Sequence, residues 1–94
     1  MAITKDNPTS FEDVLKEMQT LYEKKNHDYG NSFQILFDKI GMPYAYGHMA
    51  EKLERIWSLM SKEEQVKESM RDSLIDLANY CVLTIIELDK YENR

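Results

Sequence analysis

Cysteine, glycine and proline are scarce in this chain of 94 residues, which has one, three and two of them, respectively. A single cysteine, Cys81, excludes an intrachain disulfide. Its apolar neighbours Leu77, Val82 and Ile85 predict a buried, inert thiol rather than a nucleophile. The low content of helix-breaking residues favours an all-helical domain.

Long apolar runs are also missing. No run reaches the ~18 residues that span a bilayer, and the first residues contain no apolar signal segment. The longest apolar stretch, 74–88, is interrupted by Asp76, Asn79 and Thr84. We therefore expect a cytoplasmic protein with no membrane partner.

No large excess of positive charge is present, since 12 lysines and arginines stand against 17 acidic residues, for a net charge of −5. The two signs are interspersed along the chain. Binding to duplex nucleic acid needs a positive face that displaces counterions, so we do not expect duplex nucleic acid as a partner. A compact anionic ligand held by a few local cations remains compatible with this composition.

What is present is helical periodicity. We expect an N-terminal arm over residues 1–9 and a single helical domain over 10–94. The first helix is predicted from Ser10, a good N-cap, to about Lys25, with acidic residues in its first turn. Its apolar stripe has spacings of three and four and consists of Phe11, Val14, Leu15, Met18, Leu21 and Tyr22.

Three further helices are expected after a polar loop over 26–32. A short helix, 33–40, would be capped by Ser32 and terminated by Gly41. A third helix would begin at Pro43 and reach about Met60. The run 61–64 reads as a capping box that opens the last and longest helix. The predicted core positions of the last two helices are Met49, Leu53, Ile56, Met60, Val66, Met70, Leu74, Leu77, Cys81, Thr84 and Leu88.

The last helix carries a second apolar face, formed by Ile75, Val82, Ile85 and Ile86. A helix that is apolar on two faces needs two packing partners, and in a small chain one of them is expected to be another subunit. The sequence thus predicts an all-α fold, a small four-helix bundle that oligomerises through its long C-terminal helix, as a homodimer or homotetramer.

Polar and aromatic residues are concentrated in the stretch 26–33 and again in 68–80. On the third helix, His48, Lys52 and Arg55 share one face at spacings of four and three, and Asp72, Asp76, Asn79 and Tyr80 do so on the last helix. Packed together, these groups would form a ligand site, and the ligand we expect is a nucleotide. The candidate ligand-binding residues are Asn26, His27, Asp28, Tyr29, Asn31, Phe33, His48, Lys52, Arg55, Asp72, Asp76 and Tyr80.

Each of these groups has a purely structural alternative. The charges can form an interhelical salt-bridge network, with Arg55 pairing Asp76 or Asp72. Tyr29 and Phe33 can stack on a nucleobase or plug the end of the bundle. Trp57 is expected to be buried against a partner.

The acidic residues of the last two helices suggest a second kind of site, one that binds a metal ion. Glu51 and Glu54 are three residues apart on the third helix, and with Glu68, Asp72 and Asp76 they could ligate Mg²⁺ and polarise a triphosphate for hydrolysis. Glu51 also has ordinary ion-pair spacing to Arg55, so a solvated helix face is the simpler interpretation.

The segments Lys25–Phe33, Lys52-x-x-Arg55 and Glu68–Tyr80 together resemble the nucleotide-modification-associated helical family common in bacteriophages. The similarity covers roughly residues 11–90. More remotely, the layout resembles the all-helical MazG-type nucleoside triphosphate pyrophosphatases, whose Glu-x-x-Glu and Glu-x-x-Asp helices bind Mg²⁺. In this chain Asp76 takes the place of the final aspartate, but Ser73 stands three residues before it.

Three functions follow from the residues and the resemblance. The first is a phage protein of the infected host's cytoplasm that sequesters a nucleotide without turnover and without a cofactor, for instance a cyclic (di)nucleotide signal of bacterial anti-phage defence. The second is a Mg²⁺-dependent pyrophosphatase, with Glu51, Glu54, Asp72 and Asp76 as its catalytic carboxylates. The third is a regulatory helical module that binds another protein.

Overall fold

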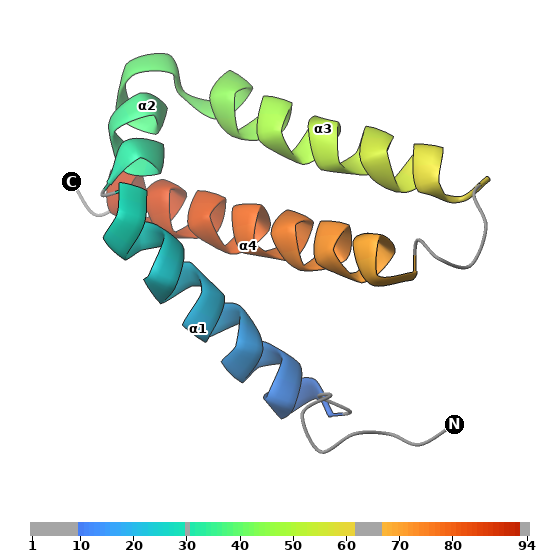
Figure 1. The fold of residues 1–94 in the computed structure, drawn as a ribbon. Coiled ribbons are helices and arrows are strands. Elements are labelled where there is room, and N and C mark those ends of the chain that lie inside the picture. The colour runs from blue at the N-terminus through green and yellow to red at the C-terminus, as the bar shows by residue number, and fades with distance from the viewer. Residues whose placement is uncertain (1–9, 30, 62–66, 93–94) are drawn as a thin grey trace. The chain divides into compact units, whose positions relative to one another are not determined.

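In a computed structural model of the protein, the described part of the chain is almost entirely helical (Figure 1). The structure describes residues 10–29, 31–61 and 67–92, without the side chains of 26–29, 67 and 68. The helices are α1 (Phe11–Tyr29), α2 (Ser32–Ile40), α3 (Met42–Leu59) and α4 (Lys67–Glu92). The predicted all-α fold of four helices is confirmed. The chain divides into two compact units, Met1–Gly30 and Asn31–Arg94, and each is described by itself.

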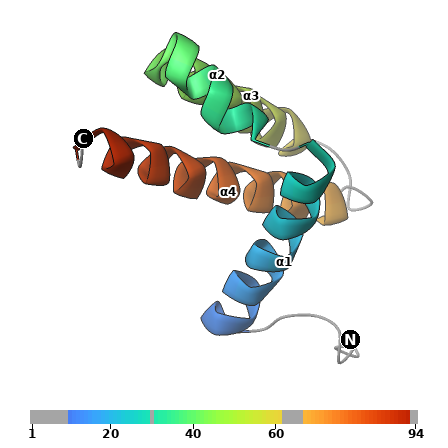
Figure 2. The same ribbon diagram turned by 90° about the vertical axis from the view of Figure 1, so that its left-hand side faces the viewer.

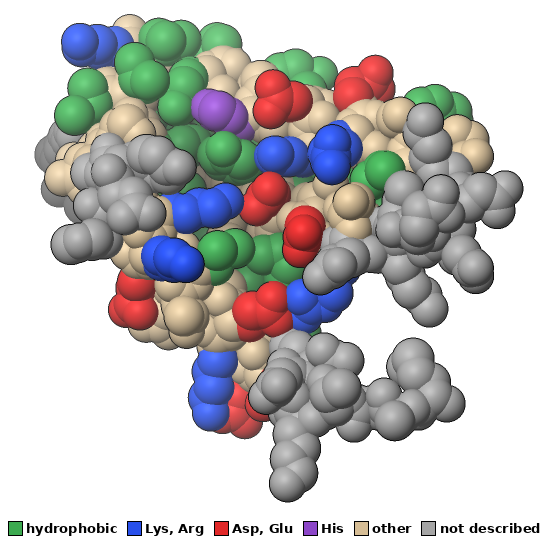
Figure 3. Space-filling view, viewed as in Figure 1, with side chains coloured by type: hydrophobic (Ala, Val, Ile, Leu, Met, Phe, Trp, Pro, Cys, Tyr) green, Lys and Arg blue, Asp and Glu red, His purple; other side chains and the backbone are tan. Residues whose placement is uncertain are grey.

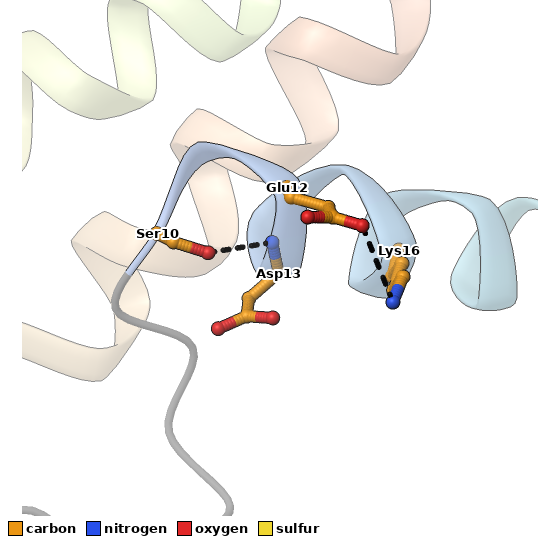
Figure 4. A network of polar contacts seen from close by, with 4 residues as sticks. All are labelled: Ser10, Glu12, Asp13 and Lys16. Carbon is orange, nitrogen blue, oxygen red and sulfur yellow. Dashed lines mark hydrogen bonds and ion pairs between the residues drawn. The ribbon is translucent and has the colours of Figure 1, made fainter.

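The first unit contains α1, which begins where the sequence predicts. The backbone N–H of Asp13 donates a hydrogen bond of 3.1 Å to Oγ of Ser10, so Ser10 is the N-cap (Figure 4). Glu12 and Lys16 form an ion pair of 3.5 Å one turn apart, with both side chains largely exposed. Such a pair contributes little to stability because water screens it.

The end of α1 differs from the prediction. The helix continues to Tyr29, so the expected loop over 26–32 is wrong for residues 26–29. Propagating a helix adds a hydrogen bond for every residue ordered, and none of these four residues is a glycine or proline that would oppose it. Polar composition alone therefore did not end the helix. Gly30, expected in a turn, lies outside the described residues.

In the second unit, α2 ends at a glycine as predicted. Gly41 has φ +88°, and its N–H donates a hydrogen bond of 2.7 Å to the carbonyl oxygen of Phe37. Pro43 follows in the first turn of α3. The N-terminus of α2 departs from the prediction, because Ser32 is already helical and Asn31 occupies the N-cap position without a side-chain capping bond.

Helices α3 and α4 lie along each other in opposite directions, and α2 packs against both of them (Figures 1 and 2). Phe37, Ala45 and Ile75 are the buried apolar residues, and Ser73 and Thr84 are also buried. Thr84 donates a 2.7 Å hydrogen bond from Oγ1 to the carbonyl oxygen of Tyr80, which satisfies its hydroxyl.

Several predicted core positions are exposed, so the core contains fewer residues than the sequence predicted. Leu53, Met60, Leu74 and Leu88 keep between 41% and 64% of their surface accessible. Cys81, expected to be buried, is exposed. Small residues explain the difference. Ala45 is fully buried and Ser73 nearly so, and small side chains at a helix contact let the axes approach, which turns larger neighbours toward the rim.

Candidate functional site

Three side-chain contacts connect α3 and α4 along one side of their interface. Nε of Arg55 donates a 3.0 Å hydrogen bond to Oγ of Ser73. Nζ of Lys52 lies 3.3 Å from Oδ2 of Asp76. The His48 imidazole stacks on the Tyr80 ring, with centroids 4.5 Å apart and an interplanar angle of 16°. Each step back along α3 matches a step forward along α4, as antiparallel helices require.

Helical periodicity explains why these six residues meet. The spacings of four and three on α3 are mirrored by spacings of three and four on α4, so both sets lie along one stripe of their helix. The structure thus brings the basic stripe of α3 to Asp76 and Tyr80 of the predicted polar stripe of α4, whereas Asp72 of that stripe is exposed. The pairing itself differs, because Lys52 rather than Arg55 pairs Asp76. We call this surface, formed by His48, Lys52, Arg55, Asp76 and Tyr80, the polar face.

Aromatic rings close one end of the polar face. The Phe33 ring of α2 contacts those of Tyr44, His48 and Tyr80, with centroid distances of 5.4, 6.3 and 6.0 Å. Tyr44 also meets His48 edge-on at 4.7 Å. The contacts of Phe33 match its structural alternative, a plug that packs α2 onto the hairpin of α3 and α4. The rings are half-buried, so part of this aromatic surface stays accessible.

The opposite side of the hairpin is apolar. There Sγ of Cys81 lies 3.7 Å from Sδ of Met49, on the flank away from Lys52 and Asp76. On the polar side, acidic and basic side chains are interspersed along the boundary of α3 and α4 (Figure 3). The hairpin therefore has two chemically different sides.

The carboxylates proposed for Mg²⁺ are not gathered in the described part of the chain. Glu51, Glu54 and Asp72 are exposed, and Asp76 is engaged by Lys52. Among the described residues, no group of three or more histidine, cysteine, aspartate or glutamate side chains is placed to hold a metal ion. The side chain of Glu68 lies outside the described residues.

The remaining predicted ligand residues are distributed as follows. The side chains of Asn26, His27, Asp28 and Tyr29 lie outside the description, and their backbone belongs to α1 in the other unit. Asn31 is exposed at the start of α2. Six of the twelve candidates lie together, either in direct contact or on the same stripe of one helix. They are Phe33, His48, Lys52, Arg55, Asp76 and Tyr80.

Two residues of the site were not among the predicted ligands. Ser73 stands out in the sequence only as the replacement for a carboxylate, yet it is 1% exposed and accepts the Arg55 bond. Tyr44 lies one helical turn before His48, and this spacing was the available signal. A serine at a helix contact can also be a simple packing residue because it is small. The residue type alone therefore did not indicate that Ser73 belongs to the site.

A family model described as "Nucleotide modification associated domain 1" matches residues 25–88, a span that contains the whole polar face. The chain belongs to this family. The family resemblance seen in the sequence is thereby confirmed, while the comparisons give no link to the MazG-type pyrophosphatases. No curated protein and no solved structure matches the chain. In the described part, no helix is both long and apolar enough to cross a membrane.

Proposed function

We propose that this protein binds a nucleotide on the polar face and holds it without converting it. The observation that supports the proposal most is the juxtaposition of Arg55 and Lys52 with the half-buried rings of His48 and Tyr80 along one edge of the hairpin. A nucleotide offers the complementary groups, phosphate oxygens for the cations and a base for the rings.

Arg55 is suited to the phosphate end. Its side chain is exposed, and the bond to Ser73 uses Nε alone, so this bond does not occupy the two terminal nitrogens that a bidentate contact with phosphate would use. Lys52, one turn away, adds a second positive charge that a phosphate could share with Asp76. The hydrogen bond to Ser73 also restricts the guanidinium, so less conformational entropy is lost on binding.

The aromatic end lies at a suitable separation. His48 and Arg55 are seven residues apart, which is about 10 Å along a helix. A ligand whose base contacts the outer surface of the His48–Tyr80 stack can therefore reach Arg55 with its phosphates. Aromatic surfaces contribute about 1–3 kcal/mol per stacked base. His48 and Tyr80 already stack on each other, so the base would add to an existing stack.

Binding without turnover fits the charge arrangement better than hydrolysis does. Hydrolysis by a Mg²⁺ mechanism needs several carboxylates directed at one ion. On the polar face, Asp76 instead lies beside an ammonium group, and Ser73 occupies the position where a second carboxylate would be useful. Within this proposal, a cyclic (di)nucleotide signal of anti-phage defence is the ligand class we favour, and sequestration of that signal is the biological role.

Arg55→Ala tests the site. Affinity for the bound nucleotide should fall by about 1.5–3 kcal/mol, measured by isothermal titration calorimetry over a panel of linear and cyclic nucleotides. Lys39→Ala is the matched control, because it removes one positive charge from an exposed position on α2 outside the polar face. If Arg55→Ala lowers only the thermal stability and leaves affinity unchanged, Arg55 is a structural partner of Ser73.

Turnover is tested separately. The intact nucleotide should be recovered after heat denaturation of the complex, and EDTA should leave its affinity unchanged. Release of pyrophosphate from a nucleoside triphosphate, lost in Asp76→Ala, would establish the enzyme instead. Absence of both binding and turnover across the panel would leave the protein-binding module.

A further inference from the structure

The polar face has three levels that follow one another along α3. His48 marks an aromatic level, Lys52 an ion-pair level and Arg55 a cationic level. Their spacings of four and three residues correspond to about 6 Å and about 4.5 Å along the helix axis. Tyr80 and Asp76 of α4 contact the first two levels in the same order. The ion pair therefore lies between the stacked rings and the guanidinium.

The polar face contains one carboxylate, that of Asp76, at the middle level. An acid does not serve a site for phosphate alone, because it repels phosphate oxygens. An ionised carboxylate accepts hydrogen bonds at about four lone-pair positions, so it can accept them from other donors besides Lys52. The side chain of Asp76 keeps 23% of its surface exposed, which leaves part of it within reach of a ligand. The middle level thus fits a ligand group that donates hydrogen bonds.

A nucleotide has such donors between its base and its phosphates. The sugar joins the two, so a nucleotide with its base at the aromatic level and its phosphates at Arg55 has its sugar beside Asp76. The hydroxyl groups of a ribose donate hydrogen bonds, and acidic side chains accept one from the 2′-hydroxyl in dinucleotide-binding proteins. The 2′-hydroxyl is also the group that distinguishes a ribonucleotide from a 2′-deoxyribonucleotide.

We infer that Asp76 accepts a hydrogen bond from the 2′-hydroxyl of the ligand, and that the polar face thereby selects ribonucleotides over 2′-deoxyribonucleotides. The Lys52 ammonium group, 3.3 Å away, offsets the repulsion between this carboxylate and the phosphates, so the acid does not exclude an anionic ligand. The inference rests on the proposed function, since it names the class of nucleotide that the same site binds.

The preference should be moderate. A hydrogen bond to a charged group is stronger than one between neutral groups, but the polar face is open enough for water to replace a missing hydroxyl. We therefore expect a ribonucleotide to bind about tenfold more tightly than its 2′-deoxy counterpart. A fully enclosed site would discriminate more strongly, because its acceptor would be left without any partner.

Matched pairs of nucleotides test the preference in the wild-type protein. The probes are ATP, GTP, CTP, UTP, cyclic di-AMP and cyclic di-GMP, each titrated by calorimetry against its 2′-deoxy counterpart. For every probe that binds, the ribonucleotide should be the tighter ligand. Equal affinities within a pair, or tighter binding of the 2′-deoxy form, overturn this inference and leave the proposed function standing. If neither member of any pair binds, the proposed function fails, and this inference fails with it.

Substitutions at Asp76 identify the group that recognises the sugar. Asp76→Asn and Asp76→Ala should reduce the preference by weakening the ribonucleotide complex, while the 2′-deoxy complex keeps its affinity or gains some because a negative charge is removed. Asp89→Asn is the matched control, since it removes a carboxylate from an exposed position of α4 about 20 Å along the helix, and it should retain the full preference. Circular dichroism checks that all three variants stay helical. An unchanged preference in both Asp76 variants, or an equal loss for both members of a pair, overturns the inference.

Discussion

The ammonium of Lys52 lies 3.3 Å from the carboxylate of Asp76, and the two side chains keep only 20% and 23% of their surface exposed. This pair is the centre of the polar face. The pair is less exposed to water than a surface ion pair, yet a ligand can still reach it. We therefore expect it to contribute both to the stability of the hairpin and to the proposed binding of a nucleotide. A metal ion that bound to Asp76 would have to displace the Lys52 ammonium group.

A double-mutant cycle measures this ion pair. Lys52→Met should lower the free energy of unfolding by about 1–2 kcal/mol, because the half-buried Asp76 carboxylate loses the ammonium group that lies 3.3 Å from it. Asp76→Asn added to it should cost little more, giving a coupling energy of about 1 kcal/mol by urea unfolding. The exposed pair Glu12–Lys16 is the control, with an expected coupling no larger than about 0.5 kcal/mol. Equal couplings at the two pairs would contradict the environment described for Lys52.

The bond between Arg55 and Ser73 predicts an effect that depends on background. Ser73→Ala should lower the free energy of unfolding by about 1 kcal/mol, since a buried hydroxyl and its hydrogen bond are lost. In the Arg55→Ala background the same change should cost nothing or stabilise, because the hydroxyl then has no partner. Ser58→Ala, at an exposed position of α3, serves as the control in both backgrounds. An identical cost of Ser73→Ala in both would show that the bond contributes no stability.

Two glycines should respond oppositely to the same substitution. Gly41 has φ +88° and ψ −159°, a conformation that a side chain strains, so Gly41→Ala should lower the free energy of unfolding by about 1–3 kcal/mol. The cost is conformational, since an added Cβ would meet Cδ of Pro43 at an ordinary 3.8 Å. Gly47 lies inside α3 with no atom within 4 Å of an added Cβ, so Gly47→Ala should stabilise by about 0.5–1 kcal/mol. Thermal melts followed by circular dichroism measure both, and a shift of the same sign would refute the assignment.

Glu87 of α4 has a buried carboxylate whose hydrogen bonding is incomplete. It is 5% exposed; Oε2 forms a 3.0 Å ion pair with Nζ of Lys90, and Oε1 has no hydrogen-bond partner among the described residues. Replacing a buried charge that is only half satisfied by an apolar side chain is neutral or stabilising, so Glu87→Met should raise the free energy of unfolding by up to about 1 kcal/mol.

Lys90→Met provides the counterpart. It removes the ammonium group that lies 3.0 Å from the Glu87 carboxylate and should destabilise by about 1–2 kcal/mol in the same urea experiment. In a Glu87→Met background, Lys90→Met should be close to neutral. A clear destabilisation by Glu87→Met alone would mean that the carboxylate makes a favourable contact which the geometry does not account for.

Local features followed from the sequence because their causes are local. Ser10 caps α1 and Gly41 ends α2 at the predicted residues, since a cap depends on a side chain or a φ angle within one turn. The shared face of His48, Lys52 and Arg55 was also predictable, because helical spacing alone places them there. Polar composition over 26–29 was a poorer guide, and α1 continues through it.

The amino-acid sequence by itself was enough to predict four helices, the family of the protein, and which residues share each helical face. Only the tertiary structure decided how far each helix is turned toward its neighbour: Ala45 and Ser73 take the contact, while Leu53, Leu74 and Cys81 face outward. It also decided that Lys52, and not Arg55, pairs Asp76. Periodicity defines faces within one helix, but the rotation between two helices depends on how closely their small residues let the axes approach, and that is a property of the packed pair.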